Sequence, residues 1–83
     1  MTIYIVENYR NEPIFQAYKT IGDAKLSLLE EYVKNCLPEI VKYIKDGNDV
    51  IENIDYIQTD IENIFAHGFV EDFAYIHECE LKE

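Results

Sequence analysis

The sequence has almost no positive charge in its second half. Residues 1–45 carry six acidic and six basic side chains, whereas residues 46–81 carry ten acidic side chains and neither lysine nor arginine. The formal net charge of −10 therefore arises entirely after Lys45. Affinity for a phosphate backbone depends on lysine and arginine, so this balance argues strongly against direct binding to nucleic acid.

Glycine and metal-ligand motifs are equally scarce. The three glycines form no glycine-rich phosphate loop, and the chain contains no nucleophile elbow. His77 and Cys79 alternate on one expected strand, but the second ligand pair of a structural zinc site is missing. We therefore expect a protein that is not an enzyme, with no catalytic residues, no cofactor and no metal.

Cysteines and long apolar runs are few as well. With no signal-peptide pattern, the two cysteines, Cys36 and Cys79, indicate reduced thiols in the cytoplasm rather than a disulfide. No apolar run approaches the ~20 residues of a membrane-spanning helix, and an acidic surface is repelled by anionic lipid. We expect a cytoplasmic protein without membrane contact.

The chain does have enough apolar and aromatic side chains for one core. Of its 83 residues 48% are hydrophobic, including seven tyrosines and four phenylalanines. A chain of this size buries only about 60% of its unfolded surface when it folds. We therefore expect residues 1–83 to form a single acidic domain of modest stability.

The two ends of the chain predict β-strands. Residues 2–9 are rich in β-branched and aromatic side chains, and residues 14–19 alternate after a polar turn over residues 10–13. These segments predict a hairpin. Residues 73–81 alternate again and would complete a sheet of three strands, with Tyr75 packed in the core.

The middle of the chain begins with a helix start signal. Thr20 and Asp23 are spaced like a capping box, and apolar side chains recur on one face of the segment that follows. Pro38 removes a backbone donor and disfavours helical dihedrals at the residue before it, so the helix either kinks or ends there. We expect two helices, the second over residues 38–46 with Gly47 as its stop.

Residues 49–65 are rich in isoleucine, which favours a strand, but their spacing predicts a helix. At about 100° per residue the apolar positions fall within an arc of about 80°, and we expect this stripe to be buried. Its members, separated by 4, 3, 4 and 3 residues, are Val50, Ile54, Ile57, Ile61 and Ile64.

These elements add up to an α+β domain of order β-β-α-α-α-β. Residues 69–72 are expected only to connect the third helix to the last strand. The predicted architecture is a small three-stranded antiparallel sheet with helices packed on one face.

Acidic side chains occupy the flanks and the back of the third predicted helix. Like charges at i,i+3 spacing destabilise a helix by roughly 0.2–0.5 kcal/mol per pair. Two explanations remain open: a solvated face that keeps the domain soluble, or a surface built for a basic partner. A helix about 25 Å long could present carboxylates at phosphate-like spacing. The residues expected to contact such a partner are Asp46, Asp49, Glu52, Asp55, Tyr56, Asp60, Glu62, Glu71 and Asp72.

The start of the chain carries a resemblance to known proteins. Ile3-Tyr4-Ile5-Val6, then Phe15 to Thr20 leading into Asp23-Ala24, resembles small phage and prophage accessory domains that begin with a hairpin and a capped helix. In size and acidity the chain is also similar to phage inhibitors that mimic DNA, with which it shares no motif. The resemblance implies a counter-defence role, for example of the anti-CRISPR type.

The expected function is that of an acidic, phage-encoded inhibitor in the host cytoplasm. It would occupy the basic nucleic-acid-binding face of a host or defence protein by DNA mimicry. The alternative is a small structural or regulatory interaction module, in the form of a homodimer that associates through apolar surface. In that case the acidic face serves only solubility.

Overall fold

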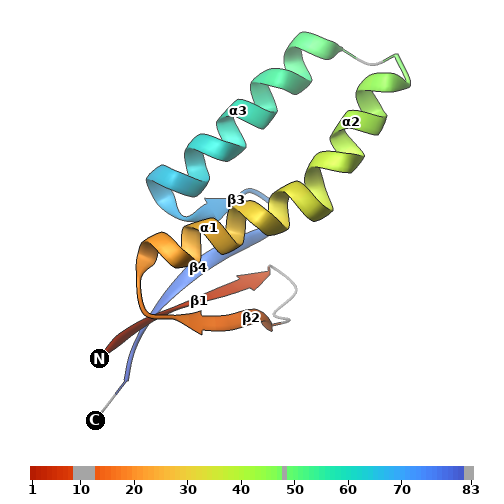
Figure 1. The fold of residues 1–83 in the computed structure, drawn as a ribbon. Coiled ribbons are helices and arrows are strands. Elements are labelled where there is room, and N and C mark those ends of the chain that lie inside the picture. Colours follow the sequence, from red (N-terminus) through yellow and green to blue (C-terminus); the bar gives the residue numbers. More distant parts are fainter. Residues whose placement is uncertain (9–12, 48, 82–83) are drawn as a thin grey trace.

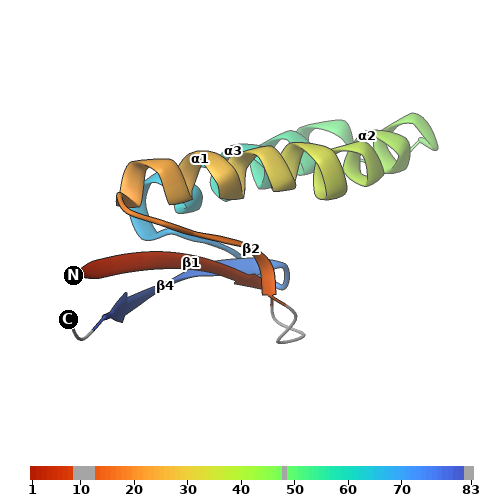
Figure 2. The ribbon, with the colours of Figure 1, turned by 60° about the horizontal axis from the view of Figure 1, so that its bottom comes forward.

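A computed structural model describes residues 1–8, 13–47 and 49–81. One layer of helices covers one face of an antiparallel sheet (Figure 1, Figure 2). The predicted α+β class is confirmed, although the numbers of strands and helices differ from the prediction. The elements are β1 (Thr2–Asn8), β2 (Pro13–Tyr18), α1 (Ile21–Glu31), the π-helical turn η1 (Tyr32–Cys36), α2 (Leu37–Lys45), α3 (Val50–His67), β3 (Phe69–Val70) and β4 (Ala74–Glu80).

The sheet has four strands in the order β2-β1-β4-β3, and every neighbouring pair is antiparallel. The inner strands β1 and β4 pair along their full length, from Thr2 opposite Glu80 to Asn8 opposite Ala74. The predicted hairpin of β1 and β2 is present. Of the turn predicted over residues 10–13, residues 10–12 lie outside the described residues, and Pro13 is the first residue of β2.

The fourth strand, β3, corrects the prediction that residues 69–72 only connect two elements. Gly68 ends α3 in the left-handed conformation, at φ 71°, and directs the chain at once into β3. Asp72, at φ 59°, lies in the turn that leads into β4. A strand of two residues is too short to produce the alternation by which strands are recognised in a sequence.

The two helices predicted on either side of Pro38 form one continuous rod, so the predicted break there is wrong. The rod runs from Ile21 to Lys45 and widens into a π turn just before the proline. Within that turn the Leu37 N–H bonds to the Tyr32 carbonyl. A proline in a regular α-helix lacks a donor and collides with the carbonyl four residues earlier. The wider turn spaces these carbonyls differently, and the helix continues.

The core lies where α1 and the end of α3 rest on the inner strands. Its buried side chains are Val6, Ala24, Leu28, Tyr32, Ile64, Val70 and Ala74. Tyr75, predicted to pack in the core, lies on the opposite face of the sheet because it alternates with buried Ala74. There its hydroxyl donates to the Glu7 carboxylate at 2.9 Å.

Beyond the sheet, α2 and the first half of α3 continue as a two-helix arm (Figure 1). No residue of α2 is buried, and Ile64 is the buried residue of α3. The prediction that the isoleucine stripe of α3 is buried is therefore wrong for its first half, where Val50 and Ile54 are 49% and 45% exposed. The apolar stripe is present on α3, but the first half of the helix extends beyond the sheet and is not covered by it.

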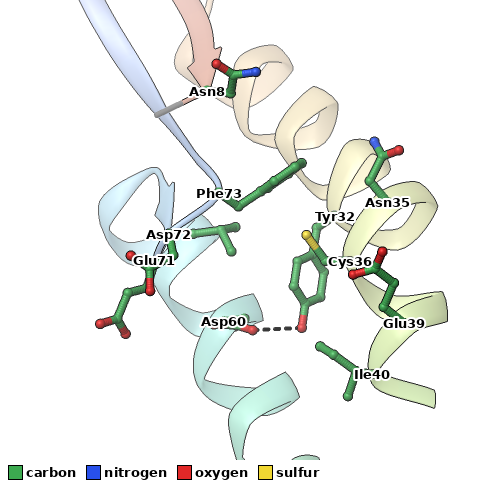
Figure 3. Close-up of a pocket in the computed structure, with 11 residues that line it drawn as sticks. Asn8, Tyr32, Asn35, Cys36, Glu39, Ile40, Asp60, Glu71, Asp72 and Phe73 are labelled. Atoms are coloured by element: carbon green, nitrogen blue, oxygen red, sulfur yellow. Dashed lines mark hydrogen bonds between the residues drawn. The ribbon is translucent and has the colours of Figure 1, made fainter. Parts of the chain in front are cut away.

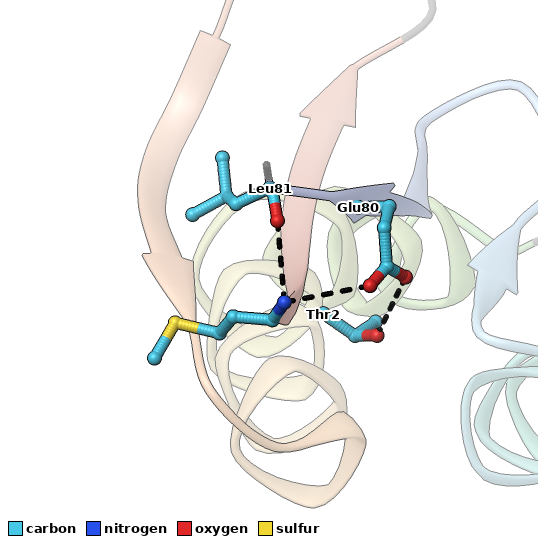
Figure 4. A network of polar contacts seen from close by, with 4 residues as sticks. Thr2, Glu80 and Leu81 are labelled. Atoms are coloured by element: carbon cyan, nitrogen blue, oxygen red, sulfur yellow. Dashed lines mark hydrogen bonds and ion pairs between the residues drawn. The ribbon is translucent and has the colours of Figure 1, made fainter. Parts of the chain in front are cut away.

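Polar contacts join the start of β1 to the end of β4 (Figure 4). The Met1 ammonium donates to the Leu81 carbonyl at 3.2 Å and lies 3.4 Å from one Glu80 carboxylate oxygen. The Thr2 hydroxyl donates to the other oxygen at 3.0 Å. These groups are exposed, so they contribute little to stability.

Gly68 is expected to be sensitive to substitution. A Cβ there would lie 3.3 Å from Ile76 Cδ1, in a backbone conformation that disfavours any L side chain. We expect Gly68→Ala to lower the free energy of unfolding by about 2 kcal/mol, against about 1 kcal/mol for Gly47→Ala. Gly47 also has a positive φ but has open space around it. Urea denaturation of both variants measures the difference, and equal losses would show that contact with Ile76 does not matter.

Candidate functional site

A cavity of about 480 Å³ lies between the arm and the turn that joins β3 to β4. We call it the acidic cavity, because its described lining residues include four carboxylates and no lysine, arginine or histidine. The lining residues are Asn8, Tyr32, Asn35, Cys36, Glu39, Ile40, Asp60, Val70, Glu71, Asp72 and Phe73 (Figure 3).

The four carboxylates reach the acidic cavity from three separate segments. Glu39 comes from α2, Asp60 from α3, and Glu71 with Asp72 from the turn after β3. Figure 3 shows Glu39 on one side and the turn residues on the opposite side. Like charges held together by the fold repel one another, and a positively charged occupant relieves that repulsion.

Asp60 is fixed at the cavity wall by Tyr32. The Tyr32 hydroxyl donates to Asp60 Oδ2 at 2.9 Å, and the rest of the tyrosine is buried in the core (Figure 3). Burial raises the pKa of Tyr32 well above its ordinary value, and the hydrogen bond and charge of Asp60 raise it further. The hydroxyl therefore remains a donor throughout the neutral range.

The thiol of Cys36 lies in the same wall. Burial, followed by the charges of Asp60 and Glu39, raises the pKa of Cys36 to about 11. The thiolate is the reactive form of cysteine. Cys36 is therefore a poor nucleophile at neutral pH.

A smaller hollow of about 270 Å³ lies beside the acidic cavity along α3. It shares Asp60, Glu71 and Asp72 with the acidic cavity and adds Asn53 and Tyr56. Tyr56 is 58% exposed, so its ring is available to a partner. Four of the predicted partner-binding residues, the tyrosine and these three carboxylates, are thus brought together.

Asp46, Asp49 and Glu52, three other predicted residues, lie at the far end of the arm. Asp46 follows the last residue of α2, Asp49 precedes the first residue of α3, and Glu52 lies in the first turn of α3. Asp49 Oδ1 accepts the Glu52 backbone N–H at 3.1 Å. Asp49 therefore has a structural task as the cap of α3, worth about 1 kcal/mol.

The remaining two predicted residues, Asp55 and Glu62, lie on the other flank of α3. On a helix of 100° per residue they are about 140° and 160° from Asp60. Both are exposed. The predicted acidic set is therefore divided among the cavity, the tip of the arm and the opposite flank.

Sequence reasoning missed Glu39, Asn8 and Asn35. They reach the cavity from β1, η1 and α2, which all precede the acidic stretch that begins at Asp46. Glu39 faces the turn after β3 because α2 continues straight from α1, whereas the sequence predicts a break at Pro38. No local pattern marks any of the three.

No known protein family, curated protein or solved structure matches this chain. No helix within the described residues is long and apolar enough to cross a membrane. In the same part of the chain, no three His, Cys, Asp or Glu side chains are placed so that they could hold a metal ion.

The thiol of Cys36 offers a direct test of the local charge. Near pH 8, iodoacetamide should alkylate it about a hundredfold more slowly than an ordinary thiol, because a pKa of about 11 in place of 9.0 lowers the thiolate fraction by that factor. Asp60→Asn removes one of the nearby negative charges, lowers the pKa and should speed the reaction. Intact-mass spectrometry in a Cys79→Ser background measures the rates.

The matched control for this measurement is Asp55→Asn, on the opposite flank of α3. It removes the same charge from the chain but not from the cavity. Equal acceleration by the two substitutions would contradict the placement of Asp60 beside Cys36.

Proposed function

We propose that the protein is an acidic protein-binding domain that holds basic side chains of a partner in the acidic cavity. One observation carries the proposal: carboxylates of three separate segments line one cavity, and its described lining contains no lysine, arginine or histidine. An inhibitor that occupies the nucleic-acid-binding face of its partner is the function best matched to such a surface.

The composition of the cavity suits a lysine or arginine side chain. Ile40, Val70 and Phe73 offer apolar wall for the aliphatic stem of such a residue. Carboxylates bind the charged head through charge-assisted hydrogen bonds, and arginine can engage one of them at two points. The side-chain amides of Asn8 and Asn35 add acceptors.

The class of partner follows from the charge of the whole second half of the chain. Nucleic-acid-binding faces are rich in lysine and arginine, because these residues contact phosphates. An acidic helix about 27 Å long, with Tyr56 and Asp60 beside the turn carboxylates, competes for such a face. Competition with nucleic acid would make the protein an inhibitor of a host or defence enzyme.

Neutralising the cavity should weaken binding to a basic ligand. We expect the combined variant Glu39→Gln, Glu71→Gln, Asp72→Asn to bind a fluorescent arginine-rich peptide at least tenfold more weakly, because charges that converge on one cationic group act together. Fluorescence anisotropy at low and at high salt measures the affinity. Binding by the unmodified protein should weaken as salt rises.

The control has the same net charge but an intact cavity. It combines Glu30→Gln, Asp46→Asn and Glu78→Gln, three exposed residues outside the cavity lining. We expect it to lose much less affinity than the cavity variant. Equal losses would mean that net charge alone attracts the peptide, and the cavity would then have no role.

A competition assay tests the inhibitory part of the proposal. Proteins retained from a bacterial lysate by the unmodified domain, but not by the cavity variant, should be released by added double-stranded DNA. Retention that DNA does not reverse would rule out mimicry of nucleic acid while leaving binding of a basic partner intact.

A further inference from the structure

One side of β4 has a strand beside it for only part of its length. Strand β1 pairs with all seven residues of β4, whereas β3, on the other side, pairs only with Ala74 and Tyr75 (Figure 1). Among the described residues, no strand lies beside residues 76–80 on that side. We call this stretch the free edge.

The hydrogen bonds at the end of the sheet show which backbone groups point out from the free edge. The Leu81 N–H donates to the Met1 carbonyl at 2.7 Å, and the Met1 nitrogen donates to the Leu81 carbonyl at 3.2 Å. Successive residues of an antiparallel strand direct their N–H and C=O to alternate sides. The odd-numbered residues of β4 therefore bond to β1, and Glu78 and Glu80 direct both backbone groups outward.

The chain itself begins a ladder along this edge and then leaves it. The Gly68 carbonyl accepts the Ile76 N–H at 2.7 Å, and β3, which follows Gly68, runs antiparallel to β4. The residues before Gly68 belong to α3, so the chain turns away from the sheet at this point. An extended segment in line with β3 would continue the ladder through both backbone groups of Glu78 and of Glu80.

A hollow of about 260 Å³ lies between the free edge and the helices. It is lined by the start of α1, by the end of α3 and, from the sheet, by Tyr4, Ile76 and Glu78. The side chains of Ile76 and Glu78 share the helix side of β4 with buried Ala74. Residues directly opposite on neighbouring strands project to the same face. The residue of an added strand that lies opposite Glu78 would therefore project toward this hollow.

The Glu78 carboxylate is available to a residue in the hollow. It is exposed and makes no hydrogen bond or ion pair with any described residue. The two basic residues of the lining are directed elsewhere. The Lys25 ammonium donates to the Phe65 carbonyl at 2.6 Å, and the His67 ring lies against Phe69, with centroids 6.1 Å apart.

The remaining surroundings suit a lysine or arginine side chain. Tyr4 and Ile76 offer apolar wall for its aliphatic stem. The hollow lies at the C-terminal end of α3, where the helix dipole favours a positive charge. Glu80 places a second carboxylate on the same side of β4, two residues along.

We propose that the free edge binds an extended, basic segment of a partner protein by β-strand addition, with lysine or arginine opposite Glu78 and Glu80. Backbone hydrogen bonds supply affinity in this mode of recognition, and alternate side chains supply specificity. Opposite charges directly across a strand pair stabilise it. The hollow and the acidic cavity share no lining residue, so the two surfaces are separate.

The same glutamates exclude a second copy of the free edge as the occupant. The positions beside Ala74 and Ile76 are already filled by β3 and Gly68. Two free edges related by a two-fold axis could therefore set Glu78 opposite only Glu78 or Glu80 of the other copy. Like charges directly opposite destabilise a strand pair, so the occupant carries the opposite charge.

The other edge of the sheet is less suited to strand addition. Strand β2 begins with Pro13, and its register with β1 shifts between Ile5 and Glu7. Prolines and bulges are common protection of exposed edges. The free edge contains no proline, and β4 pairs with β1 in unbroken register.

Hydrogen exchange of the full chain, followed by NMR, tests the proposal with a synthetic peptide in which lysine alternates with valine and both ends are capped. In the protein alone, the amides of Glu78 and Glu80 should exchange rapidly, because they point outward. The peptide should slow both by roughly tenfold or more. The amides of His77 and Cys79 bond to β1 and should be protected with or without it.

Two N-methylated peptides of the same charge serve as matched probes. In the proposed register the lysine amides point toward β4 and the valine amides toward solvent. Methylation of the lysine amides should therefore abolish binding, whereas methylation of the valine amides should change the affinity by less than about twofold.

Charge reversal on the protein tests the role of the glutamates. Glu78→Lys with Glu80→Lys should weaken binding of the alternating peptide by about tenfold or more. Asp55→Lys with Glu62→Lys produces the same net charge on α3 and should weaken it much less. All four side chains are exposed, and circular dichroism checks that both variants fold.

Three results would overturn the inference. A peptide that binds without slowing exchange of Glu78 and Glu80 occupies another surface. Equal binding of the two methylated peptides would show that no ladder forms. An edge that binds no peptide at all carries its glutamates only to prevent strand pairing.

The cavity variant separates this inference from the proposed function. It should bind the alternating peptide with unchanged affinity, because its three substitutions lie outside the hollow. Loss of this peptide together with the arginine-rich peptide would place both on the acidic cavity and would overturn strand addition alone. Failure of the arginine-rich peptide to depend on the cavity would leave the exchange result at the free edge untouched.

Discussion

The arrangement of this molecule depends on one buried side chain, Tyr32. Its ring belongs to the core, its carbonyl accepts the Leu37 N–H across the π turn, and its hydroxyl donates to Asp60. One residue thus connects the sheet, the turn that carries the helix past Pro38, and the position of α3. If the rod ended at the proline, Glu39 would not face the turn after β3, and the acidic cavity would lose one wall.

The helices are longer than the sheet, and this mismatch decides which of their side chains are buried. Where the sheet lies beneath the helices, Ala24 and Leu28 are buried. Farther along, the sheet no longer lies beneath the arm, so Val50 and Ile54 of the α3 stripe are 49% and 45% exposed, and the side of the arm toward the sheet carries the acidic cavity. Apolar surface in water is unfavourable by about 25 cal/mol for each Å², so the exposed part of the stripe lowers the stability of the domain.

The sequence predicts the secondary-structure elements better than the way in which they pack together. The capping threonine, the helical period of α3 and the β1–β2 hairpin are local signals, and all three are correct. The continuous rod is not predicted, because Pro38 breaks a regular α-helix and the π turn that accommodates it has no sequence signature. The acidic cavity could therefore be predicted only in part. Asp60, Glu71 and Asp72 lie in the acidic second half of the sequence, which marks them as candidates. Glu39 lies in the first half, where acidic and basic residues balance, and it reaches the cavity only because the rod continues past Pro38.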